Sequence, residues 1–466
     1  MQESQLSASL EQRWRGLTDK YLPVRAASDV WVYSREPGPD DADQGWKLHI
    51  SATIGSACQL LERVGPLLSK EGILFKGPRS LAELARLNSG LYFGYSQVGK
   101  WLPVYPNNRL QAVEVAHQLD AVTSGLPAPT VPYDFPLRPR SCIYYRYGAF
   151  VRRDFEKEDG STVLGLLTPD GRVVPDERDR ASIPDWEIDP FQTIHTTVPV
   201  AEVQQGNPFN TYEVFHVLSQ RGKGGVYLAI DSGSTPNRVC VIKEGRLNGE
   251  PEWDGRDGAW RVKRELDNLL TLNSLGSVVP SIYSFFELEG NSYLVTEFIE
   301  GPNLQTMLSR RKRRLSFSLF VNYGIQLANL LDPLHKAGWV WRDCKPSNLV
   351  VCKSGKLRPL DFESAQPTKQ ANPLSWVTAA FAAPETRELN YVPSVSEDLY
   401  AMGVVFYYLL TGNYPEQPNY APIEKLRRNV PPPIINVVNA LLSANPSERP
   451  TAASVANTLS MVTASG

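Results

Sequence analysis

Residues 341–348 read Trp-Arg-Asp-Cys-Lys-Pro-Ser-Asn, and this stretch constrains the fold of the chain more than any other. It places the carboxylate of Asp343, the ammonium of Lys345 and the amide of Asn348 close together along the sequence. Such groups can accept a proton, neutralise an anion and coordinate a cation. An isolated Arg-Asp dipeptide is more often a surface ion pair, so the meaning of this stretch depends on its surroundings.

Six further features flank the stretch in a fixed order. Upstream, an apolar run typical of a buried strand ends in a lysine, and a segment with leucines at helical spacing follows it. Downstream come an Asp-Phe pair, an Ala-Pro-Glu triplet, a buried-type Asp and a late Arg. The residues concerned are Lys243, Glu265, Asp361 with Phe362, Ala383 to Glu385, Asp398 and Arg449. Ordinary surface residues do not explain this order.

The ordered features resemble those of protein kinases, which implies a bilobal fold that uses ATP and Mg²⁺. By position, Asp343 would accept the proton of a substrate hydroxyl. Lys345 would contact the transferred phosphoryl group, and Asn348 and Asp361 would hold Mg²⁺.

The same resemblance assigns nucleotide binding to upstream residues. Lys243 would hold the α- and β-phosphates of ATP and pair with Glu265. A loop after a predicted strand at 212–218 would cover the phosphates, and its backbone amides can cradle an anion. The glycines of this loop are Gly222, Gly224 and Gly225.

Three departures from the kinase pattern leave an inactive pseudokinase scaffold open as an alternative. Trp341 replaces the usual His of the catalytic loop, and Glu363 replaces the Gly that usually follows Asp-Phe. The second exchange removes backbone freedom to adopt φ > 0. In the glycine loop only Gly224 falls on a usual glycine position. The residues assigned to ATP, Mg²⁺ and proton transfer are nevertheless all present.

The chain length suits two or three domains, the composition suits a cytoplasmic protein, and the resemblance implies an α+β fold of two domains. The chain has 466 residues, which suits a first domain with its linker at 1–205 and a kinase-like domain at 206–466. The small lobe would span about 206–302 and the large lobe about 303–460. The net charge of −2 gives no sign of nucleic-acid or membrane binding. Five Cys without a CxxC pair predict neither disulfides nor zinc.

The first domain carries cations in strand-like settings. In the alternating segment 46–52, Lys47 and His49 share one face, and the apolar residues share the other. Lys76, Lys100 and Arg146 each lie among apolar or aromatic neighbours. This pattern favours a phosphate pocket over a solvated surface.

These segments, over roughly residues 20–195, resemble the lyase domain of class III and class IV lanthipeptide synthetases, in which a kinase domain follows directly. That domain is similar to phosphothreonine lyases, which remove phosphate by β-elimination. By position, Lys76 would be the base that takes the Cα proton, and His49 the acid that protonates the departing phosphate. Cations that grip the phosphate would be Lys47, Lys100 and Arg146, with Arg25 and Arg152 as further candidates.

The chemistry requires a lysine that is partly neutral. A free Lys has a pKa of about 10.4, so burial and neighbouring cations would have to lower the pKa of Lys76. A bound phosphate dianion would favour the protonated form of His49. The plainer alternative is that His49 is a core histidine and Lys76 a lysine at a strand end.

A run of cations, Arg310-Arg-Lys-Arg-Arg314, stands apart from both sets of motifs. It is expected between helices early in the large lobe. The run is either a solvated helix end or a clamp for an acidic peptide.

Together, the two resemblances predict a dehydratase that acts on Ser or Thr of a precursor peptide with a leader sequence. The kinase would phosphorylate the residue, and the lyase would then expel phosphate to leave dehydroalanine or dehydrobutyrine. The chain ends at Gly466, so ring formation is expected to need a separate cyclase protein. The alternative function is a regulatory Ser/Thr kinase whose first domain only binds phosphopeptides.

Overall fold

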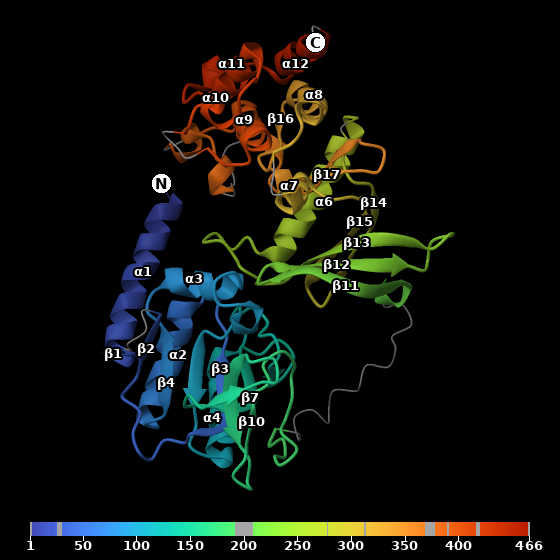
Figure 1. The fold of residues 1–466 in the computed structure, drawn as a ribbon. Coiled ribbons are helices and arrows are strands. Elements are labelled where there is room, and N and C mark those ends of the chain that lie inside the picture. The colour runs from blue at the N-terminus through green and yellow to red at the C-terminus, as the bar shows by residue number, and fades with distance from the viewer. Residues whose placement is uncertain are drawn as a thin grey trace. The chain divides into compact units, whose positions relative to one another are not determined.

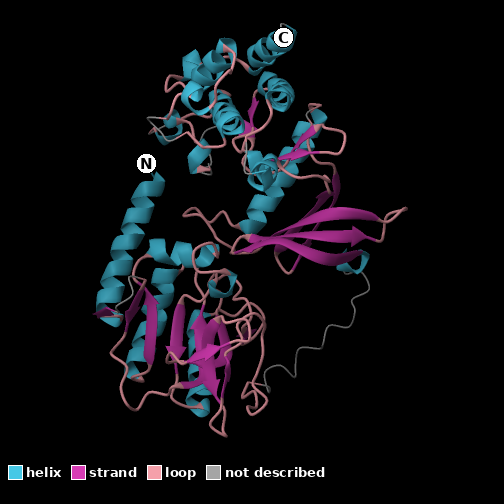
Figure 2. Cartoon of the chain, in the orientation of Figure 1, coloured by secondary structure: helices cyan, strands magenta, loops and turns pink. Residues whose placement is uncertain are grey.

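The computed structural model describes residues 2–25, 30–191, 208–276, 278–311, 314–368, 378–388, 391–415 and 420–464. The chain divides into two compact units (Figure 1). The first unit contains residues 1–238, 242–261 and 286–293, and the second contains the remainder. The domain boundary predicted near residue 205 lies outside the described residues. As predicted, the fold mixes helices with sheets throughout (Figure 2).

The first unit is built on a seven-stranded antiparallel sheet with the order β1-β2-β4-β5-β3-β7-β6. Its strands are β1 (Val24–Arg25), β2 (Trp31–Tyr33), β3 (Gln44–Ile50), β4 (Leu74–Pro78), β5 (Leu102–Tyr105), β6 (Phe135–Pro136) and β7 (Ile143–Ala149). The associated helices are α1 (Gln2–Tyr21), α2 (Ala57–Lys70), α3 (Leu81–Ser89) and α4 (Arg109–Thr123). Helices α2 and α4 contact each other, and α4 also contacts β3 and β7.

Strand β3 alternates its side chains as its sequence predicts. Trp46, Leu48 and Ile50 belong to the hydrophobic core of this unit. Lys47 and His49 project from the opposite face, and they too are buried. Both faces of β3 are therefore covered, which removes the polar groups of the second face from bulk water.

A separate three-stranded sheet follows the seven-stranded sheet along the chain. It has the order β10-β9-β8 and consists of β8 (Asp154–Glu156), β9 (Thr162–Leu167) and β10 (Val173–Pro175). Strand β9 contacts β7. The chain that leaves β10 carries charged residues toward the cations of β3 and β7.

A five-stranded sheet follows, in the order β11-β12-β13-β15-β14. Its strands are β11 (Tyr212–Arg221), β12 (Gly224–Asp231), β13 (Arg238–Gly245), β14 (Ile282–Leu288) and β15 (Asn291–Glu297), and helix α6 (Gly258–Ser274) lies between β13 and β14 in sequence. The short 3₁₀ helix η2 (Pro208–Thr211) precedes β11. Residues of this sheet are divided between the two units.

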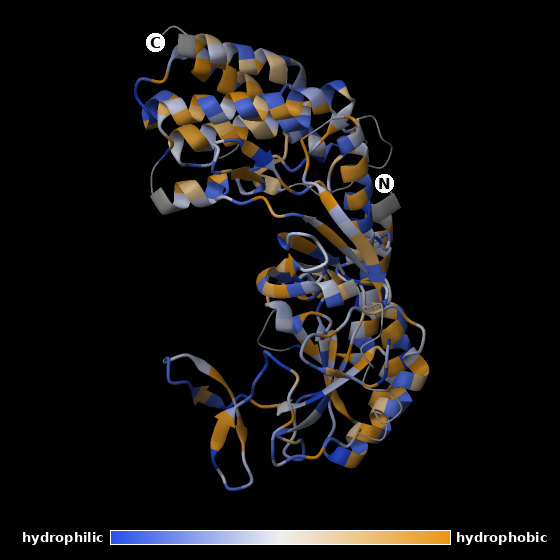
Figure 3. Ribbon diagram, turned by 90° about the vertical axis from the view of Figure 1, so that its right-hand side faces the viewer, coloured by the Kyte–Doolittle hydropathy of each residue, from blue (hydrophilic) through white to orange (hydrophobic). Residues whose placement is uncertain are grey.

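The second unit is mainly helical. Its helices are α7 (Leu304–Arg311), α8 (Phe317–Lys336), α9 (Ser396–Thr411), α10 (Ile423–Leu426), α11 (Pro432–Leu441) and α12 (Ala452–Ala464). Short strands β16 (Trp339–Val340), β17 (Leu349–Val351), β18 (Leu357–Pro359) and β19 (Gln366–Pro367) form two small ladders. The helices nearest the C-terminus alternate hydrophobic and hydrophilic segments, as expected for helices with one buried face (Figure 3).

Helix α9 is the central helix of the second unit. It is buried along almost its whole length and contacts α8, α10 and α11, while α8 also packs against α12. In the described part of the chain, no helix combines the length and the apolar character needed to cross a bilayer.

Candidate active sites

Strand pairing in the first unit brings together the predicted phosphate-binding cations. Lys47 of β3 lies directly opposite Arg146 of β7 in the antiparallel register. Lys100 precedes β5, the strand on the other side of β3. Lys47, Lys100, Arg146 and His49 are each at most 6% exposed. Like charges gathered at this depth favour an anion, because no water shields them from one another.

Asp134 lies at the centre of this cluster and was missed by the sequence analysis. Its Oδ2 is 2.5 Å from Nδ1 of His49, and its Oδ1 is 2.9 Å from Nζ of Lys100. The Asp134 side chain is completely buried. A neutral His49 therefore carries its hydrogen on Nδ1, which leaves Nε2 as the atom that can exchange a proton with a ligand.

A second carboxylate was also missed, together with an arginine. Asp176 follows β10, and its Oδ1 lies 2.6 Å from Nη2 of Arg146. Its Oδ2 accepts a hydrogen bond from Nη2 of Arg178 at 2.9 Å. Lys47 Nζ donates to the carbonyl oxygen of Ala149 at 2.9 Å. Asp176 thus fixes two guanidinium groups, and Arg178 joins the set of cations.

The surroundings shift the pKa values of the histidine and its neighbours. The pKa of His49 is lowered to about 3: burial is the largest cause, Asp134 opposes it, and the nearby cations Lys100 and Lys47 add to the lowering. Burial also lowers the pKa of Lys47 and of Lys100. Without an anion His49 is therefore neutral, and a bound phosphate would raise its pKa and drive proton uptake.

Lys76 occupies a different environment from the other cations. Its Nζ lies 4.7 Å from the centroid of the Trp31 ring, 5.6 Å from that of Tyr33 and 6.0 Å from that of Tyr105. No carboxylate forms an ion pair with it among the described residues. Burial first, and then the charge of Arg178, lower the pKa of Lys76 to about 8. About a tenth of Lys76 is therefore neutral at pH 7, a far larger share than for a free lysine, as the expected base requires.

The two further phosphate-binding candidates differ in position. Arg25 lines an open cavity of about 290 Å³ together with Lys76 and Tyr105. Arg152 is not brought into this group: its side chain is 79% exposed and pairs with Asp154. Sequence position alone could not separate these two arginines, because both lie beside strands of the same sheet.

The second candidate site lies in the second unit, around Asp343. Lys345 Nζ is 2.7 Å from Asp343 Oδ1, and Asn348 Nδ2 donates to Asp343 Oδ2 at 2.7 Å. Thr378 was missed by the sequence analysis; its hydroxyl donates to Asp343 Oδ1 at 3.2 Å and accepts from Lys345 Nζ at 3.2 Å. Lys345 and Asn348 therefore lie at the carboxylate expected to take the hydroxyl proton.

Asp361 is held near Asp343 by an unusual backbone. Its φ is 64°, so Asp361 is the residue of this segment with a left-handed backbone. The exchange of glycine for Glu363 therefore affects a different position. Trp341 donates its indole N–H to the carbonyl oxygen of Asp361 at 2.8 Å, and its ring stacks on Phe362. Burial, followed by the charge of Asp361, raises the pKa of Asp343.

Buried contacts hold the catalytic loop and two further motifs of the second unit in place. Asp398 accepts the backbone N–H groups of Trp341 and Arg342 at 2.8 and 2.7 Å. Arg449 donates from both terminal nitrogens to Glu385 at 2.5 and 2.9 Å. Glu265 accepts the N–H of Phe362 at 3.2 Å. Asp398 and Arg449, the buried-type Asp and the late Arg of the sequence pattern, are thus paired in the interior.

The donors at this site fit Mg²⁺. The carboxylate of Asp361 and the side-chain oxygen of Asn348 are hard oxygen ligands of the kind this ion prefers. Asp343 and Asp361 raise each other's electrostatic energy, and a cation would relieve that repulsion. Asn348 already orients its amide nitrogen toward Asp343, which directs its oxygen elsewhere.

The residues expected to bind the nucleotide phosphates belong to the first unit. That they form one ATP site with the Mg²⁺ ligands stays a prediction. Lys243 lies in β13, and Gly222 lies in the turn between β11 and β12. A Cβ on Gly224 would meet the carbonyl oxygen of Glu244 at 1.8 Å, and one on Gly225 would meet Tyr227 Oη at 2.2 Å. Glycine is thus required in this hairpin for close packing, whatever it binds.

Each half of the chain matches a known protein family. Residues 17–201 match the family model described as RamC, N-terminal domain, and residues 212–459 match the protein kinase domain. The chain is 30% identical over 394 residues to the probable SapB synthase of Streptomyces coelicolor. That match covers 81% of this chain and 41% of the synthase.

Serine/threonine-protein kinases match the second half. The kinase PknA of Nostoc is 29% identical over 261 residues, which is 52% of this chain and 46% of that kinase. PknA of Mycobacterium tuberculosis is 26% identical over 258 residues, covering 51% and 58% respectively. The chain therefore spans about half the length of the relatives it matches.

Proposed function

Because this chain belongs to the protein kinase family and carries a RamC N-terminal domain, we propose that it dehydrates Ser and Thr residues of a precursor peptide in two steps. The first step phosphorylates the hydroxyl, and the second eliminates the phosphate. The similarity to a SapB synthase supports a lanthipeptide-type precursor with a leader sequence as the substrate. We place the reaction in the cytoplasm, where ATP is abundant. The predicted separate cyclase remains a prediction.

The phosphorylation step uses the residues around Asp343. ATP with Mg²⁺ supplies the phosphoryl group, and Asn348 and Asp361 are the residues that would hold the metal. Asp343 orients the substrate hydroxyl and takes its proton as the new P–O bond forms, while the bond between the γ-phosphorus and the bridging oxygen breaks and ADP leaves. Lys345, 2.7 Å from Asp343, places a positive charge beside the group in transfer.

The elimination step uses Lys76 and His49. Neutral Lys76 takes the proton from Cα of the phosphorylated residue, and the electrons of that C–H bond form the double bond to Cβ. The bond between Cβ and the phosphate oxygen breaks, and its electrons leave with the phosphate. His49 delivers a proton from Nε2 to that oxygen. The cations around Asp134 and Asp176 hold the phosphate and stabilise the charge that develops on it.

The observation that carries the proposal is that one sheet holds a lysine in an aromatic environment and a histidine in a charged one. Lys76 lies among aromatic rings with its pKa lowered to about 8. His49 lies 2.5 Å from a carboxylate within a cluster of buried cations. A base with a lowered pKa and an anion site with a proton donor, both on one sheet, are what β-elimination of phosphate requires.

Mass spectrometry of a peptide substrate tests the proposal directly. A Ser- or Thr-containing precursor peptide is incubated with the full chain, ATP and Mg²⁺. Dehydration lowers the mass by ~18 Da per site, whereas phosphorylation alone raises it by ~80 Da. A stable gain of ~80 Da would instead identify a kinase with a phosphopeptide-binding domain. Unchanged peptide under conditions that support related synthetases would favour the pseudokinase alternative.

A further inference from the structure

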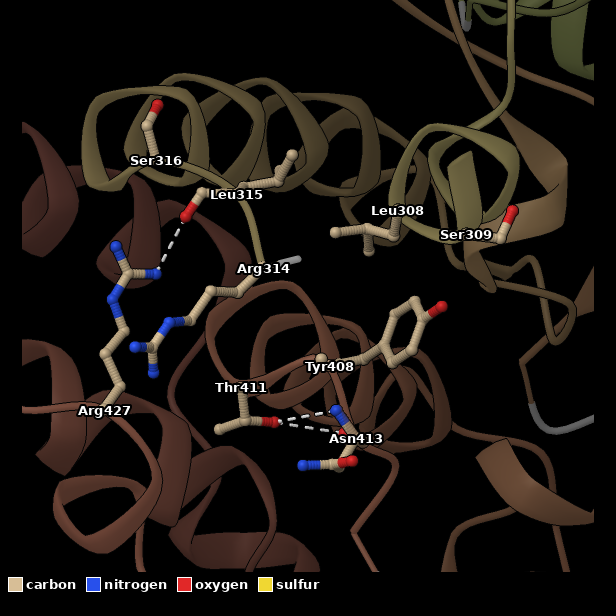
Figure 4. A pocket seen from close by; sticks show the side chains of 10 residues that line it. Leu308, Ser309, Arg314, Leu315, Ser316, Tyr408, Thr411, Asn413 and Arg427 are labelled. Carbon is tan, nitrogen blue, oxygen red and sulfur yellow. Dashed lines mark hydrogen bonds between the residues drawn. The ribbon is translucent and has the colours of Figure 1, made fainter. Parts of the chain in front are cut away.

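An open pocket on the second unit is used by neither proposed reaction (Figure 4). Its volume is about 940 Å³, and it lies between the C-terminal end of α7, the N-terminal end of α8 and the C-terminal end of α9. Arg427, just after α10, completes its wall. A space of this size accommodates several residues of a peptide and far exceeds a single phosphate.

Two arginines give the pocket its charge. Figure 4 shows the guanidinium groups of Arg314 and Arg427 next to each other on one side of the pocket. Arg427 donates to the carbonyl oxygens of Leu315 and Leu410 at 3.0 and 3.3 Å, and Arg314 donates to that of Leu426. Backbone carbonyls thus fix both side chains.

The positive charge of this pair is not neutralised locally. None of the described lining residues is Asp or Glu, and neither arginine forms an ion pair with a carboxylate in the described part of the chain. Burial and the neighbouring Arg314 lower the pKa of Arg427, as expected for two like charges held together. Such a pair favours carboxylates as ligands, because guanidinium groups bind them with two parallel hydrogen bonds.

The opposite side of the pocket is partly apolar. Leu308 is 4% exposed and Leu315 is 1% exposed, and the ring of Tyr408 stacks on Tyr414 beside them. Thr411 and Asn413 add polar groups at the rim. The lining therefore combines a cationic wall, the partly exposed ring of Tyr408 and a polar rim, which suits an acidic peptide with some apolar side chains.

Further cations near the two arginines in the sequence also favour an acidic ligand. Arg314 ends the run of five cations that begins at Arg310, and Arg428 follows Arg427. Arg314 is the member of that run whose side chain the structure describes. Cations such as Arg314 and Arg427 steer an acidic partner toward the pocket and raise the rate of association.

We propose that this pocket, which we call the Arg314–Arg427 pocket, binds an acidic segment of the substrate peptide, separate from the residue that is phosphorylated. This inference rests on the proposed function, because it assumes that the second unit phosphorylates a peptide. Carboxylates of the segment pair with Arg314 and Arg427, and an apolar side chain packs on the ring of Tyr408. The segment thereby tethers the peptide and raises the local concentration of its hydroxyls.

Binding can be measured without ATP, which separates this inference from catalysis. The probe is a fluorescein-labelled peptide of alternating glutamate and leucine, titrated with the full chain and followed by fluorescence anisotropy. We expect saturable binding that weakens as NaCl rises, and no binding of the matching glutamine-leucine peptide. The double variant Arg314→Gln/Arg427→Gln should bind about tenfold more weakly. Lys356→Gln, which removes an exposed cation outside the pocket, should bind like the unaltered chain.

A variant with the charge of Arg314 reversed distinguishes the loss of charge from a loss of folding. Arg314→Glu should weaken the glutamate probe and gain affinity for a lysine-leucine peptide, a gain that an unfolded pocket cannot produce. Equal glutamate-probe affinity in the double variant and the unaltered chain would overturn the inference. Displacement of the probe by inorganic phosphate or by anionic phosphatidylserine vesicles would also overturn the inference. Both competitors are tested at an ionic strength at which NaCl alone leaves the probe bound. If the probe binds as expected while no peptide is phosphorylated, the proposed function fails instead.

Discussion

The imidazole of His49 is held through Nδ1 by the fully buried carboxylate of Asp134, 2.5 Å away. The same carboxylate lies 2.9 Å from Lys100, so one side chain positions both a proton donor and a phosphate-binding cation. Asp134 opposes the effect of burial on the pKa of His49. Its role is therefore to position the ring and to make protonation attainable when phosphate binds.

Asp134→Asn should slow phosphate elimination by about 100-fold, because His49 loses the negative charge that raises its pKa and fixes its tautomer. Phosphorylation should continue, so phosphopeptide accumulates in the mass spectrum. Asp154→Asn, which changes an exposed carboxylate in the same unit, serves as the control and should leave elimination unaltered. Normal elimination in Asp134→Asn would remove this residue from the mechanism.

The elimination rate should rise with pH through a midpoint of about 8 in kcat/KM, as Lys76 loses its proton. The sign follows from the role of Lys76: only the neutral amine accepts the Cα proton, and its fraction grows as pH increases. A chemically phosphorylated peptide without ATP isolates this step. In Lys76→Arg the side chain stays charged and the activity should disappear. A rate that falls steadily with pH over this range would contradict the assignment of Lys76 as base.

Asp343→Asn should abolish phosphorylation and leave elimination from a pre-phosphorylated peptide intact. The reason is that Asp343 and Lys76 belong to separate units with their own cores. Both reactions can be followed by mass, the first with ATP and the second without it. Loss of both activities in this variant would show that the two reactions depend on one another.

Trp341→Phe should lower the free energy of unfolding by about 1 kcal/mol and reduce the phosphorylation rate, because the hydrogen bond to the carbonyl oxygen of Asp361 is lost while most of the ring contact with Phe362 remains. Denaturant unfolding and initial rates of phosphopeptide formation measure the two effects. Trp339→Phe provides a partly buried Trp-to-Phe control without this bond. A fully active Trp341→Phe would make the indole a packing group only.

The order of motifs along the chain predicted more of the second site than of the first. Asp343, Lys345 and Asn348 lie within one short loop, so their proximity follows from the covalent chain itself. The φ of 64° at Asp361 was not foreseen, because the sequence drew attention to the missing glycine at position 363. Thr378 is distant in sequence from Asp343 and belongs to no pattern that marks it.

The first site depends on contacts between residues far apart in the chain, and a single sequence gives no pattern that predicts them. Period-2 alternation placed Lys47 and His49 on one face of a strand, and the structure agrees. Asp134 and Asp176 lie beside short strands at β6 and β10, where no periodicity identifies the direction of a side chain. Their partners were visible as cations, and the signal that could have led to them is that buried cations require buried carboxylates.

The register of β3 against β7 has a consequence for how this sheet can change over time. Lys47 opposes Arg146 because the two strands pair residue by residue. Inserting or deleting one residue in either strand would turn its charged side chains into the apolar core and its apolar side chains into the buried cation cluster. Lineages of such proteins are therefore free to exchange individual amino acids here, whereas changes in strand length would be eliminated by selection.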